Sequence, residues 1–311
     1  MSLAVVFPGQ GSQFVGMGAD LVQRFAEARR TFEEADAELG FALSRLAFAG
    51  PAEELTATRN AQPAILVHSV AVLRVLGERL GPVGSTAGHS LGEFSAHVCA
   101  GTLSFVDALT AVHVRGSLMY EAGLARPGGM AAVLGLDDAA LVAVCDEVST
   151  PDSVVVPANF NSAGQVVVSG DRDAVERAMA PLQQAGAKRV VPLQVSGAFH
   201  SPLMVPAQEG LRRHLEGLDF HDPRVPVFSN VTAAPVQGGA DARARLVEQL
   251  TAPVRWAESV AAQVAHGADR FLELGPGSVL TGLGRRNAKG VPARAVGTAA
   301  ELEEFLREET G

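Results

Sequence analysis

Short apolar runs and longer helical patterns alternate along most of the chain. The run Leu3–Phe7 is continuously apolar and ends at Pro8-Gly9, which is typical of a strand buried on both faces of a mostly parallel sheet. Apolar residues recur at helical spacing in Gln62–Leu80, where Pro63 is tolerated close to the expected helix start. Strands that alternate with helices in this way favour an α/β fold whose sheet is covered on its faces.

The remaining elements of the larger unit follow from the same periodicities. Strands are expected at Val83–Gly88, Val225–Asn230 and Arg270–Leu274, and helices at Ala19–Leu39, Leu91–Ala100, Phe105–Ala122, Pro206–Leu218, Asp241–Leu250 and Val254–Val264. With 311 residues, the chain is long enough to bury a large core and to hold one large domain and a smaller one.

The segment Met130–Leu193 has a different order of elements. Patterns of strand, helix, strand, strand, helix and strand follow one another, and Asn161-Ser162-Ala163-Gly164 forms a hairpin-like connection between the middle strands. This β-α-β-β-α-β order is that of the ferredoxin-like unit. We therefore expect a large α/β domain formed by 1–126 and 196–311, with a small ferredoxin-like domain, 127–195, inserted into it.

Composition excludes several classes of partner. Thirty-four acidic residues against 25 basic ones give a net charge of −9, which does not suit broad binding to a phosphate backbone, so nucleic acid is not an expected partner. The longest stretches without a charged side chain contain Pro, Asn, Gln and Gly and are poor membrane spans. Cys99 and Cys145 form no Cys-x-x-Cys pair and are typical of reduced packing residues. With no secretory signal, the chain is expected to be soluble and cytoplasmic.

One motif is typical of a serine nucleophile. Gly88-His89-Ser90-Leu91-Gly92 matches Gly-x-Ser-x-Gly, a sharp turn from a strand into a helix that exposes the serine hydroxyl above a sheet. The two glycines let the backbone turn and let neighbouring elements approach closely. Ser90 would lie at a helix N-terminus, where free N–H groups stabilise negative charge, and the N–H of Leu91 would form half of an oxyanion hole. The alternative is a glycine-rich turn with an incidental serine.

A serine nucleophile needs a base, and His200 is the best placed of the eight histidines. It lies in the loop Val195–Pro202, where the chain re-enters the large domain, and a loop in that place suits a general base. His89 is adjacent to Ser90 in the sequence but would point away from it in a sharp turn. From the residues alone, the choice between a general base and an ordinary loop histidine stays open.

Weaker signals come from Gln10 and Arg115. Gly9-Gln10-Gly11 follows the first strand, but Phe14 stands where a dinucleotide-binding fingerprint needs glycine. The Gln10 N–H is either a second oxyanion donor or part of an ordinary strand-end turn. Arg115 lies in an apolar helical stretch, where it either pairs structurally or receives a carboxylate. The chain has no Walker loop and no His-Glu-x-x-His motif, so neither ATP binding nor a zinc protease site is expected.

Together these segments resemble the malonyl-CoA:acyl carrier protein transacylase family. The family includes the discrete enzymes of fatty acid synthesis and the stand-alone acyltransferases of polyketide pathways. The resemblance covers essentially the whole chain. It rests, in the family's order, on Phe7–Gln13, Gln62–Ala64, Gly88–Glu93, Arg115-Gly116, Gly129–Val133, Asn159–Gln165, Gly197–Pro202 and Glu273–Gly277.

The resemblance implies a large domain like that of the α/β-hydrolases and a two-step transfer. Ser90 would attack the thioester of malonyl-CoA with His200 as base, and the phosphopantetheine thiol of an acyl carrier protein would then attack the malonyl-serine ester. Gln10 and Leu91 would supply the oxyanion amides. A main-chain carbonyl at the position of Gln249 would orient His200, which explains why no triad aspartate is evident. No metal and no cofactor of the protein's own are implied, and the chain is expected to act as a monomer.

Two residues are implied in the choice of acyl group. Arg115 matches the family's carboxylate-binding arginine, which favours a dicarboxylic acyl group over acetyl because a buried guanidinium otherwise loses its partner. Phe199 resembles the malonyl-selecting pattern of polyketide acyltransferases, since a phenyl ring there would crowd a methyl branch. One methyl group discriminates by only about 1–3 kcal/mol, so methylmalonyl or hydroxymalonyl transfer stays an alternative.

This sequence departs from the family pattern at three positions. Phe94 and Phe160 stand where many relatives have tyrosine, and Ser278 replaces a frequent lysine, which weakens the expected contacts to phosphate or carrier. Because carrier proteins are acidic, the acidic chain needs a local basic surface. The candidates for that surface are Arg285, Arg286 and Lys289 in one group and Lys188 with Arg189 in another. Either group is equally well explained as an ordinary solvent-exposed face.

Two other functions compete with transfer. A serine hydrolase such as a thioesterase would use the same nucleophile and base, but it has no need to hold a carboxylate at Arg115 while it waits for a thiol. A non-catalytic carrier-docking homologue would be expected to lack Ser90 or His200, and both are present. The sequence identifies neither the pathway nor the carrier protein.

Overall fold

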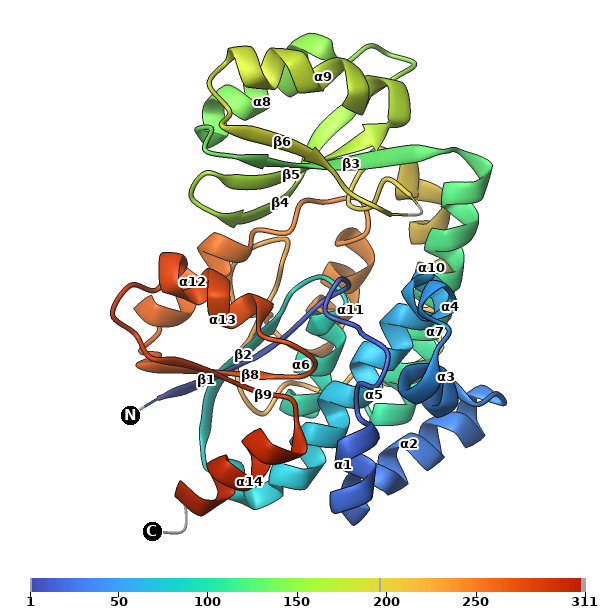
Figure 1. Cartoon of the computed structure of the whole chain (residues 1–311), viewed down its shortest axis with the longest axis vertical. Helices are drawn as coiled ribbons and strands as arrows, with labels where there is room; N and C mark the ends of the chain where they lie inside the picture. The colour runs from blue at the N-terminus through green and yellow to red at the C-terminus, as the bar shows by residue number, and fades with distance from the viewer. Residues whose placement is uncertain (1, 196, 309–311) are drawn as a thin grey trace.

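A five-stranded parallel sheet forms the centre of the larger body of the molecule (Figure 1). The computed structural model describes residues 2–195 and 197–308. The strands are β1 (Leu3–Phe7), β2 (Val83–Gly88), β7 (Val227–Phe228), β8 (Arg270–Leu274) and β9 (Ala293–Val296), in the order β7-β2-β1-β8-β9. Every neighbouring pair is parallel, which confirms the expected mostly parallel sheet.

Helices cover both faces of this sheet. Successive residues of a strand point to opposite faces, so Val5 packs into the core shared with α5 (Thr58–Leu76). Val6 packs instead with α12 (Trp256–Ala265) and α13 (Val279–Asn287). Because both faces are buried, the strand needs apolar residues at every position, which is the origin of the continuous run in the sequence.

The larger body has further helices along its length. They are α1 (Ala19–Arg24), α2 (Ala26–Leu39), α3 (Leu43–Ala49), α4 (Ala52–Thr56), α6 (Gly92–Ala100), α7 (Phe105–Ala125), α10 (Val205–Glu216), α11 (Gly239–Glu248) and α14 (Ala299–Glu308), with 3-10 turns η1 (Gly77–Leu80) and η2 (Pro202–Met204). Among the described residues, no helix combines the length and the apolar character needed to cross a membrane.

Some expected boundaries were wrong. The single helix expected at Ala19–Leu39 is broken at Phe25, whose extended backbone (φ −124°, ψ 124°) separates α1 from α2. Helix α5 begins four residues before the expected start, so Pro63 lies inside the helix. The strand expected at Val225–Asn230 has only two residues. The short helices α3 and α4, together with α13, β9 and α14, were not predicted, since elements of five to seven residues such as α3 and α4 hold too few turns to show a period.

The smaller body is a four-stranded antiparallel sheet with two helices on one face (Figure 1). Its elements are β3 (Gly128–Leu134), α8 (Asp138–Val148), β4 (Val155–Ser162), β5 (Gln165–Asp171), α9 (Arg172–Gln184) and β6 (Arg189–Pro192), with the strand order β4-β5-β3-β6. This confirms the ferredoxin-like unit. We place its boundaries at 127–195 as a proposal. Ser196, where the larger domain is expected to resume, lies outside the described residues.

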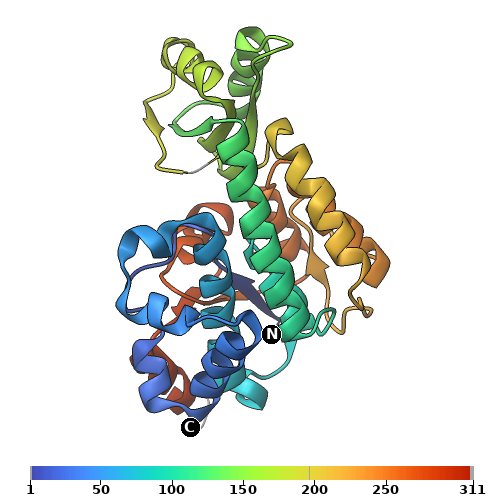
Figure 2. The same ribbon diagram turned by 90° about the vertical axis from the view of Figure 1, so that its right-hand side faces the viewer.

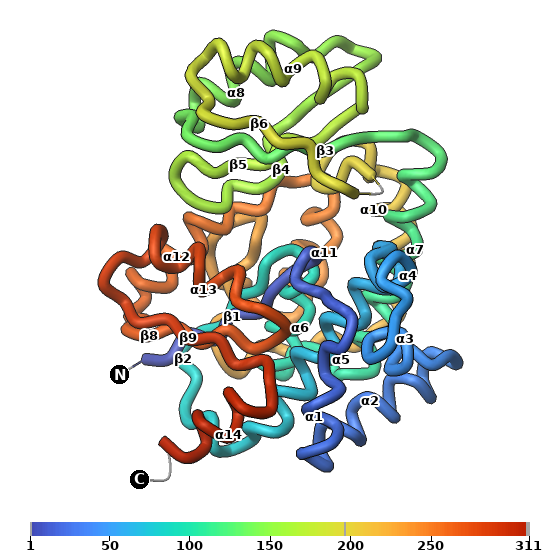
Figure 3. Tube along the Cα trace, viewed as in Figure 1, coloured from blue at the N-terminus to red at the C-terminus, as the bar shows by residue number. Residues whose placement is uncertain are grey.

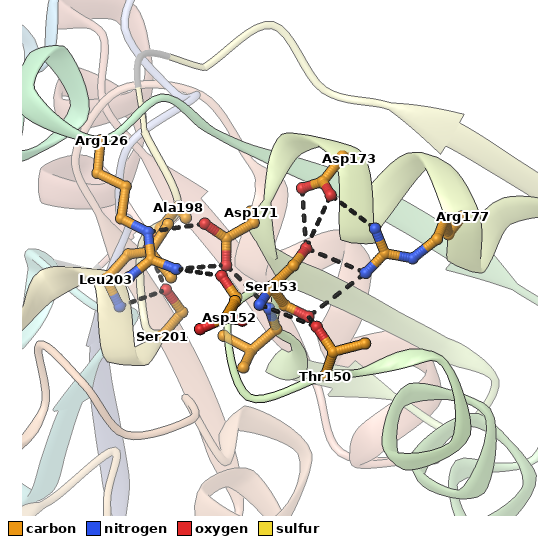
Figure 4. Close-up of polar contacts among 11 residues, drawn as sticks. Arg126, Thr150, Asp152, Ser153, Asp171, Asp173, Arg177, Ala198, Ser201 and Leu203 are labelled. Carbon is orange, nitrogen blue, oxygen red and sulfur yellow. Dashed lines mark hydrogen bonds and ion pairs between the residues drawn. The ribbon is translucent and has the colours of Figure 1, made fainter.

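The chain passes between the two bodies twice (Figure 3). Helix α7 runs beside α10 and ends under the smaller body (Figure 2). Just after it, Arg126 donates to both carboxylate oxygens of Asp171, at 2.7 and 2.9 Å, and to the carbonyl of Asp152 at 3.1 Å (Figure 4). Strand β4 of the smaller body is also attached to the larger one, because the Phe160 N–H donates to the Val254 carbonyl at 2.9 Å. The small sheet is thereby held over the carboxyl ends of the parallel strands.

Candidate active site

The carboxyl edge of the parallel sheet carries the candidate residues. Gln10 follows β1, Ser90 follows β2 and Asn230 follows β7, and ligands of open α/β sheets bind at this edge. A cavity of about 380 Å³ lies there, between the two bodies. Its walls include Gln10, Gln62, His89, Ser90, Phe199 and His200 from the larger body and Met130, Asn161 and Val167 from the smaller one.

The turn at Ser90 is held by close backbone packing. A Cβ atom on Gly88 would lie 1.9 Å from the carbonyl carbon of Gly92, and one on Gly92 would lie 2.2 Å from the Phe7 carbonyl oxygen. Only glycine fits at both places. Ser90 itself has φ 52°, a left-handed conformation that costs a non-glycine residue free energy and persists only where the surroundings enforce it.

Ser90 and His200, 110 residues apart in the sequence, are in hydrogen-bond contact. The distance from Ser90 Oγ to His200 Nε2 is 2.8 Å, and His200 Nδ1 lies 2.8 Å from the main-chain oxygen of Gln249. A carbonyl oxygen can only accept, so Nδ1 carries the proton and Nε2 is free to accept the proton of the serine hydroxyl. The structure therefore places the three residues in the relation that a nucleophile, a base and an orienting group require.

Burial keeps the base neutral. Burial, and then the positive charge of Arg115, lower the pKa of His200 to about 3. The imidazole is consequently unprotonated at neutral pH and can accept a proton. His200 also has a left-handed backbone, with φ 56°, so both partners of this hydrogen bond are held in strained conformations.

Arg115 lies directly behind the serine. Its guanidinium is fully buried and donates to Ser90 Oγ at 3.0 Å, to the side-chain oxygen of Gln249 at 2.9 Å and to that of Gln62 at 2.6 Å. Burial lowers the pKa of Arg115 to about 10, which still leaves it charged at neutral pH. A buried cation beside a nucleophile is suited to a substrate that carries a carboxylate.

The other predicted residues border the same cavity or the same turn. Gln10 lines the cavity and Leu91 follows Ser90. In the part of the chain that the structure describes, neither backbone N–H donates to another protein atom, so both are available to an oxyanion. Phe199 lines the cavity next to His200 and is 6% exposed. The roles assigned to these three residues stay predictions.

Sequence reasoning missed three polar residues of the site. Asn230 accepts from the Ser90 N–H at 2.7 Å and donates to the Gly88 carbonyl at 2.7 Å. Glu93 is fully buried and accepts from the Gln249 side chain at 2.7 Å. The third is Gln62, the partner of Arg115. Glu93 and Gln62 stood in motifs already noted, whereas Asn230 had only its place after a strand as a signal.

The basic candidates for carrier contact lie on the surface. Arg285, Arg286 and Lys289 are exposed on or just after α13, and Arg286 donates to Gln165 of the small domain at 2.6 Å. Lys188 and Arg189 are exposed at the start of β6. Within residues 2–195 and 197–308, no group of three His, Cys, Asp or Glu side chains is arranged to hold a metal ion.

The chain is similar to proteins of one family over nearly all of its length. A family model described as acyl transferase domain matches residues 4–308. The malonyl CoA-acyl carrier protein transacylase of Bacillus subtilis is 47% identical over 310 residues, 99% of this chain and 98% of the relative. The crystal structure of an acyl-carrier-protein S-malonyltransferase from Bartonella henselae superposes with a TM-score of 0.94 at 43% identity, covering all of both chains.

A third similar protein was solved as a complex. It is a malonyl-transacylase bound to its holo acyl-carrier protein of a type II polyketide synthase, with a TM-score of 0.94 and 45% identity. The match covers 99% of this chain and all of that one.

Proposed function

Because this chain belongs to the acyl transferase domain family, we propose that it moves a malonyl group from malonyl-CoA to the phosphopantetheine thiol of an acyl carrier protein. The group travels as an ester on Ser90. The transfer serves fatty acid or polyketide synthesis. It uses no metal and no cofactor of the protein's own. A cytoplasmic location is part of the proposal and is supported by the two free cysteines, Cys99 and Cys145.

The first half of the reaction acylates the enzyme. His200 Nε2 takes the hydroxyl proton as Ser90 Oγ bonds to the thioester carbonyl carbon. The carbon–sulfur bond then breaks, and the proton passes from His200 to the departing CoA sulfur. The amides of Gln10 and Leu91 receive the negative oxygen, and each such donor contributes ~3 kcal/mol to lowering the barrier.

The second half returns the acyl group to sulfur. The carrier thiol gives its proton to His200 and bonds to the ester carbonyl carbon. Ser90 Oγ leaves and takes that proton back, so the enzyme ends as it began. In both halves of the reaction the Gln249 carbonyl accepts from His200 Nδ1–H. This bond keeps His200 Nε2 directed at the serine oxygen or the thiol sulfur with which it exchanges the proton.

The observation that carries the proposal is the position of Arg115. Its guanidinium lies 3.0 Å from the nucleophile, so a carboxylate on the carbon next to the ester carbonyl would meet a buried positive charge. Malonyl has that carboxylate, and acetyl lacks it. A thioesterase has no need of such a group beside its serine. Phe199, on the cavity wall, is proposed to disfavour a methyl branch, and the exposed Arg285, Arg286 and Lys289 to attract the acidic carrier.

Intact mass measurement tests the proposal. The protein is incubated separately with malonyl-CoA, methylmalonyl-CoA and acetyl-CoA, and its mass is recorded before and after a holo carrier protein is added. A malonyl adduct that maps to Ser90, persists in buffer and disappears onto the carrier supports transfer. Steady release of free malonate without a lasting adduct would show a hydrolase. A preference for methylmalonyl would contradict the role given to Phe199.

A further inference from the structure

Glu93 is a buried carboxylate to which the proposed chemistry assigns no task. It lies in the first turn of α6, three residues after Ser90, and is 0% exposed. None of the salt bridges among the described residues involves it. Burial raises its pKa to about 7, so keeping this group inside the protein is costly unless its neighbours need it.

One oxygen of Glu93 holds two residues of the site. Its Oε2 accepts from the Gln249 side-chain amide at 2.7 Å and from the Asn230 backbone N–H at 3.1 Å. These two residues come from separate loops of the large domain. The carboxylate is therefore the point at which both loops are tied to the helix that carries the nucleophile.

The same two residues hold Ser90 on either side. The Ser90 N–H donates to Asn230 Oδ1 at 2.7 Å, and its carbonyl accepts from Gln249 Nε2 at 3.0 Å. Ser90 needs such support, because its backbone is left-handed. Both peptide groups around the strained residue are thus fixed by partners that Glu93 itself fixes.

Gln249 carries the effect to the other groups. Its side-chain oxygen accepts from Arg115 and its main-chain oxygen accepts from His200. Glu93 and the Ser90 carbonyl together accept from the side-chain nitrogen of Gln249, and this fixes the amide with its oxygen toward Arg115.

We propose that Glu93 is a positioning residue of the acyl transfer site. By holding Gln249 and Asn230 it sets the nucleophile turn, the direction of the Arg115 guanidinium and the carbonyl that orients His200. The inference rests on the proposed function, and it assigns Glu93 no contact with substrate.

The test compares Glu93→Ala with Glu93→Gln. The alanine variant removes the acceptor, whereas the glutamine side chain keeps an oxygen that can accept from the same two donors. Each variant is assayed for the rate of Ser90 malonylation, for transfer to holo carrier protein, and for its preference for malonyl-CoA over acetyl-CoA. Displacement of reacting groups by about 1 Å costs roughly 100-fold in rate. We expect a loss of that size in Glu93→Ala, with a smaller malonyl preference, and less than a tenfold loss in Glu93→Gln.

Glu273→Gln is the matched control. Glu273 is also a fully buried carboxylate, and it accepts from two backbone amides, those of Leu280 and Thr281. Leu280 lines the cavity, but among the described residues neither Leu280 nor Thr281 is hydrogen-bonded to Ser90, Arg115 or His200. We expect this variant to keep the malonylation rate and the malonyl preference, even where it lowers the unfolding temperature.

Several outcomes decide the matter. A malonylation rate of Glu93→Ala within threefold of the unchanged protein would overturn the inference, as would a loss that Glu93→Gln shares in full. If Glu93→Ala does not fold, Glu93→Asp replaces it, because the shorter side chain withdraws the carboxylate from both donors: a 100-fold loss supports the inference and an unchanged rate contradicts it. If the unchanged protein takes up no malonyl group at Ser90, the proposed function fails instead, so the two failures are distinguishable.

Discussion

The molecule contains two polar networks that use the same kinds of side chain in opposite surroundings. The first, here called the Ser90 network, consists of Ser90, Glu93, Arg115, His200 and Gln249. The second, the Arg177 cluster, consists of Thr150, Ser153, Asp173 and Arg177 at the edge of the small domain (Figure 4). Both contain an arginine, a carboxylate and a serine joined by short hydrogen bonds.

The Arg177 cluster has good geometry and open access to water. Arg177 donates to Asp173 at 2.6 Å across one helical turn, and Ser153 lies 2.9 Å from each oxygen of the same carboxylate. The Asp173 side chain is 65% exposed. If a partner is removed, water replaces it, so the cluster adds little to stability.

The Ser90 network has similar distances but is largely shielded from water, since only Ser90, on the cavity wall, is partly exposed. Glu93, Arg115 and Gln249 are fully buried and His200 is 3% exposed. Loss of any member leaves another charge or amide without a partner in the interior, which costs far more than the hydrogen bond itself. Burial rather than distance therefore ranks the two networks, and the Arg126–Asp171 pair, with side chains 52% and 10% exposed, should fall between them.

Removal of the nucleophile should have the largest effect. Ser90→Ala deletes the atom that bonds to the acyl group, and we expect transfer to holo carrier protein to fall at least ~10⁴-fold, as in other serine enzymes. Intact mass after incubation with malonyl-CoA should show no adduct. An adduct of the same mass on another residue would show that the Ser90 network is not the site of acylation.

Removal of the buried cation should follow. In Arg115→Ala the malonyl carboxylate loses its partner and Glu93 loses a nearby positive charge, so kcat/KM for malonyl-CoA should drop about 100- to 1000-fold. Acetyl-CoA should be affected much less, and the ratio of the two kcat/KM values is the measurement. An equal drop for both thioesters would argue that Arg115 supports the turn and not the carboxylate.

The titration of Glu93 should make the free energy of unfolding depend on pH. Because its pKa rises from 4.5 to about 7 in the fold, it stabilises the fold fully below pH 4.5 and loses that contribution as the pH rises to about 7. The unfolding free energy of the unchanged protein, minus that of Glu93→Gln, should therefore fall by on the order of 3 kcal/mol between pH 4.5 and 7.5. Urea titrations at several pH values measure it, and a difference that is flat with pH would contradict it.

Removal of the half-buried Arg126–Asp171 ion pair should have a moderate effect on the free energy of unfolding. Among the described residues, Arg126→Ala leaves the Asp171 side chain with only the backbone amide of Val154, at 2.8 Å, as a hydrogen-bond partner, and should lower the unfolding free energy by about 1–2 kcal/mol. The malonylation rate should change less than threefold, because the site lies elsewhere. A loss of malonylation rate greater than threefold would mean that the pair sets the position of the small domain over the cavity.

Substitution in the exposed Arg177 cluster should have the smallest effect on stability and on transfer. Arg177→Ala should shift Tm by less than about 2 °C and leave transfer unchanged. It is also the control for Arg126→Ala, since both replace an arginine that donates to an aspartate of the small domain (Figure 4). A shift as large as that of Arg126→Ala would show that exposure does not rank these contacts.

The parts of this site that were predictable have local signals. Two glycines within five residues indicate the turn at Ser90, and an unbroken apolar run indicates the buried strand Leu3–Phe7. The β-α-β-β-α-β order was readable because each small-domain element shows its own period. His200, like Arg115 and Gln10, stayed ambiguous until the family resemblance was considered, since nothing within its loop specifies a partner 110 residues away.

Other parts have no local signal. The contacts of Glu93 join it to residues 137 and 156 positions further along, and a pattern of neighbouring residues cannot report them. A glutamate in the first turn of a helix is ordinarily explained by the helix dipole, which hides its burial. The break at Phe25 likewise depends on tertiary packing, because the helical pattern continues through it.

The wide spacing of the site along the chain has a consequence for synthesis. Ser90, Arg115, His200 and Gln249 come together only when the whole small domain has been made and the chain has returned. A nascent chain that has released only residues 1 to 195 from the ribosome lacks both the base and the carbonyl that orients it. Contacts at such separation close late in folding. Regain of activity during refolding should therefore lag behind recovery of secondary structure, and the enzyme cannot consume malonyl-CoA before the segment that carries Gln249 is in place.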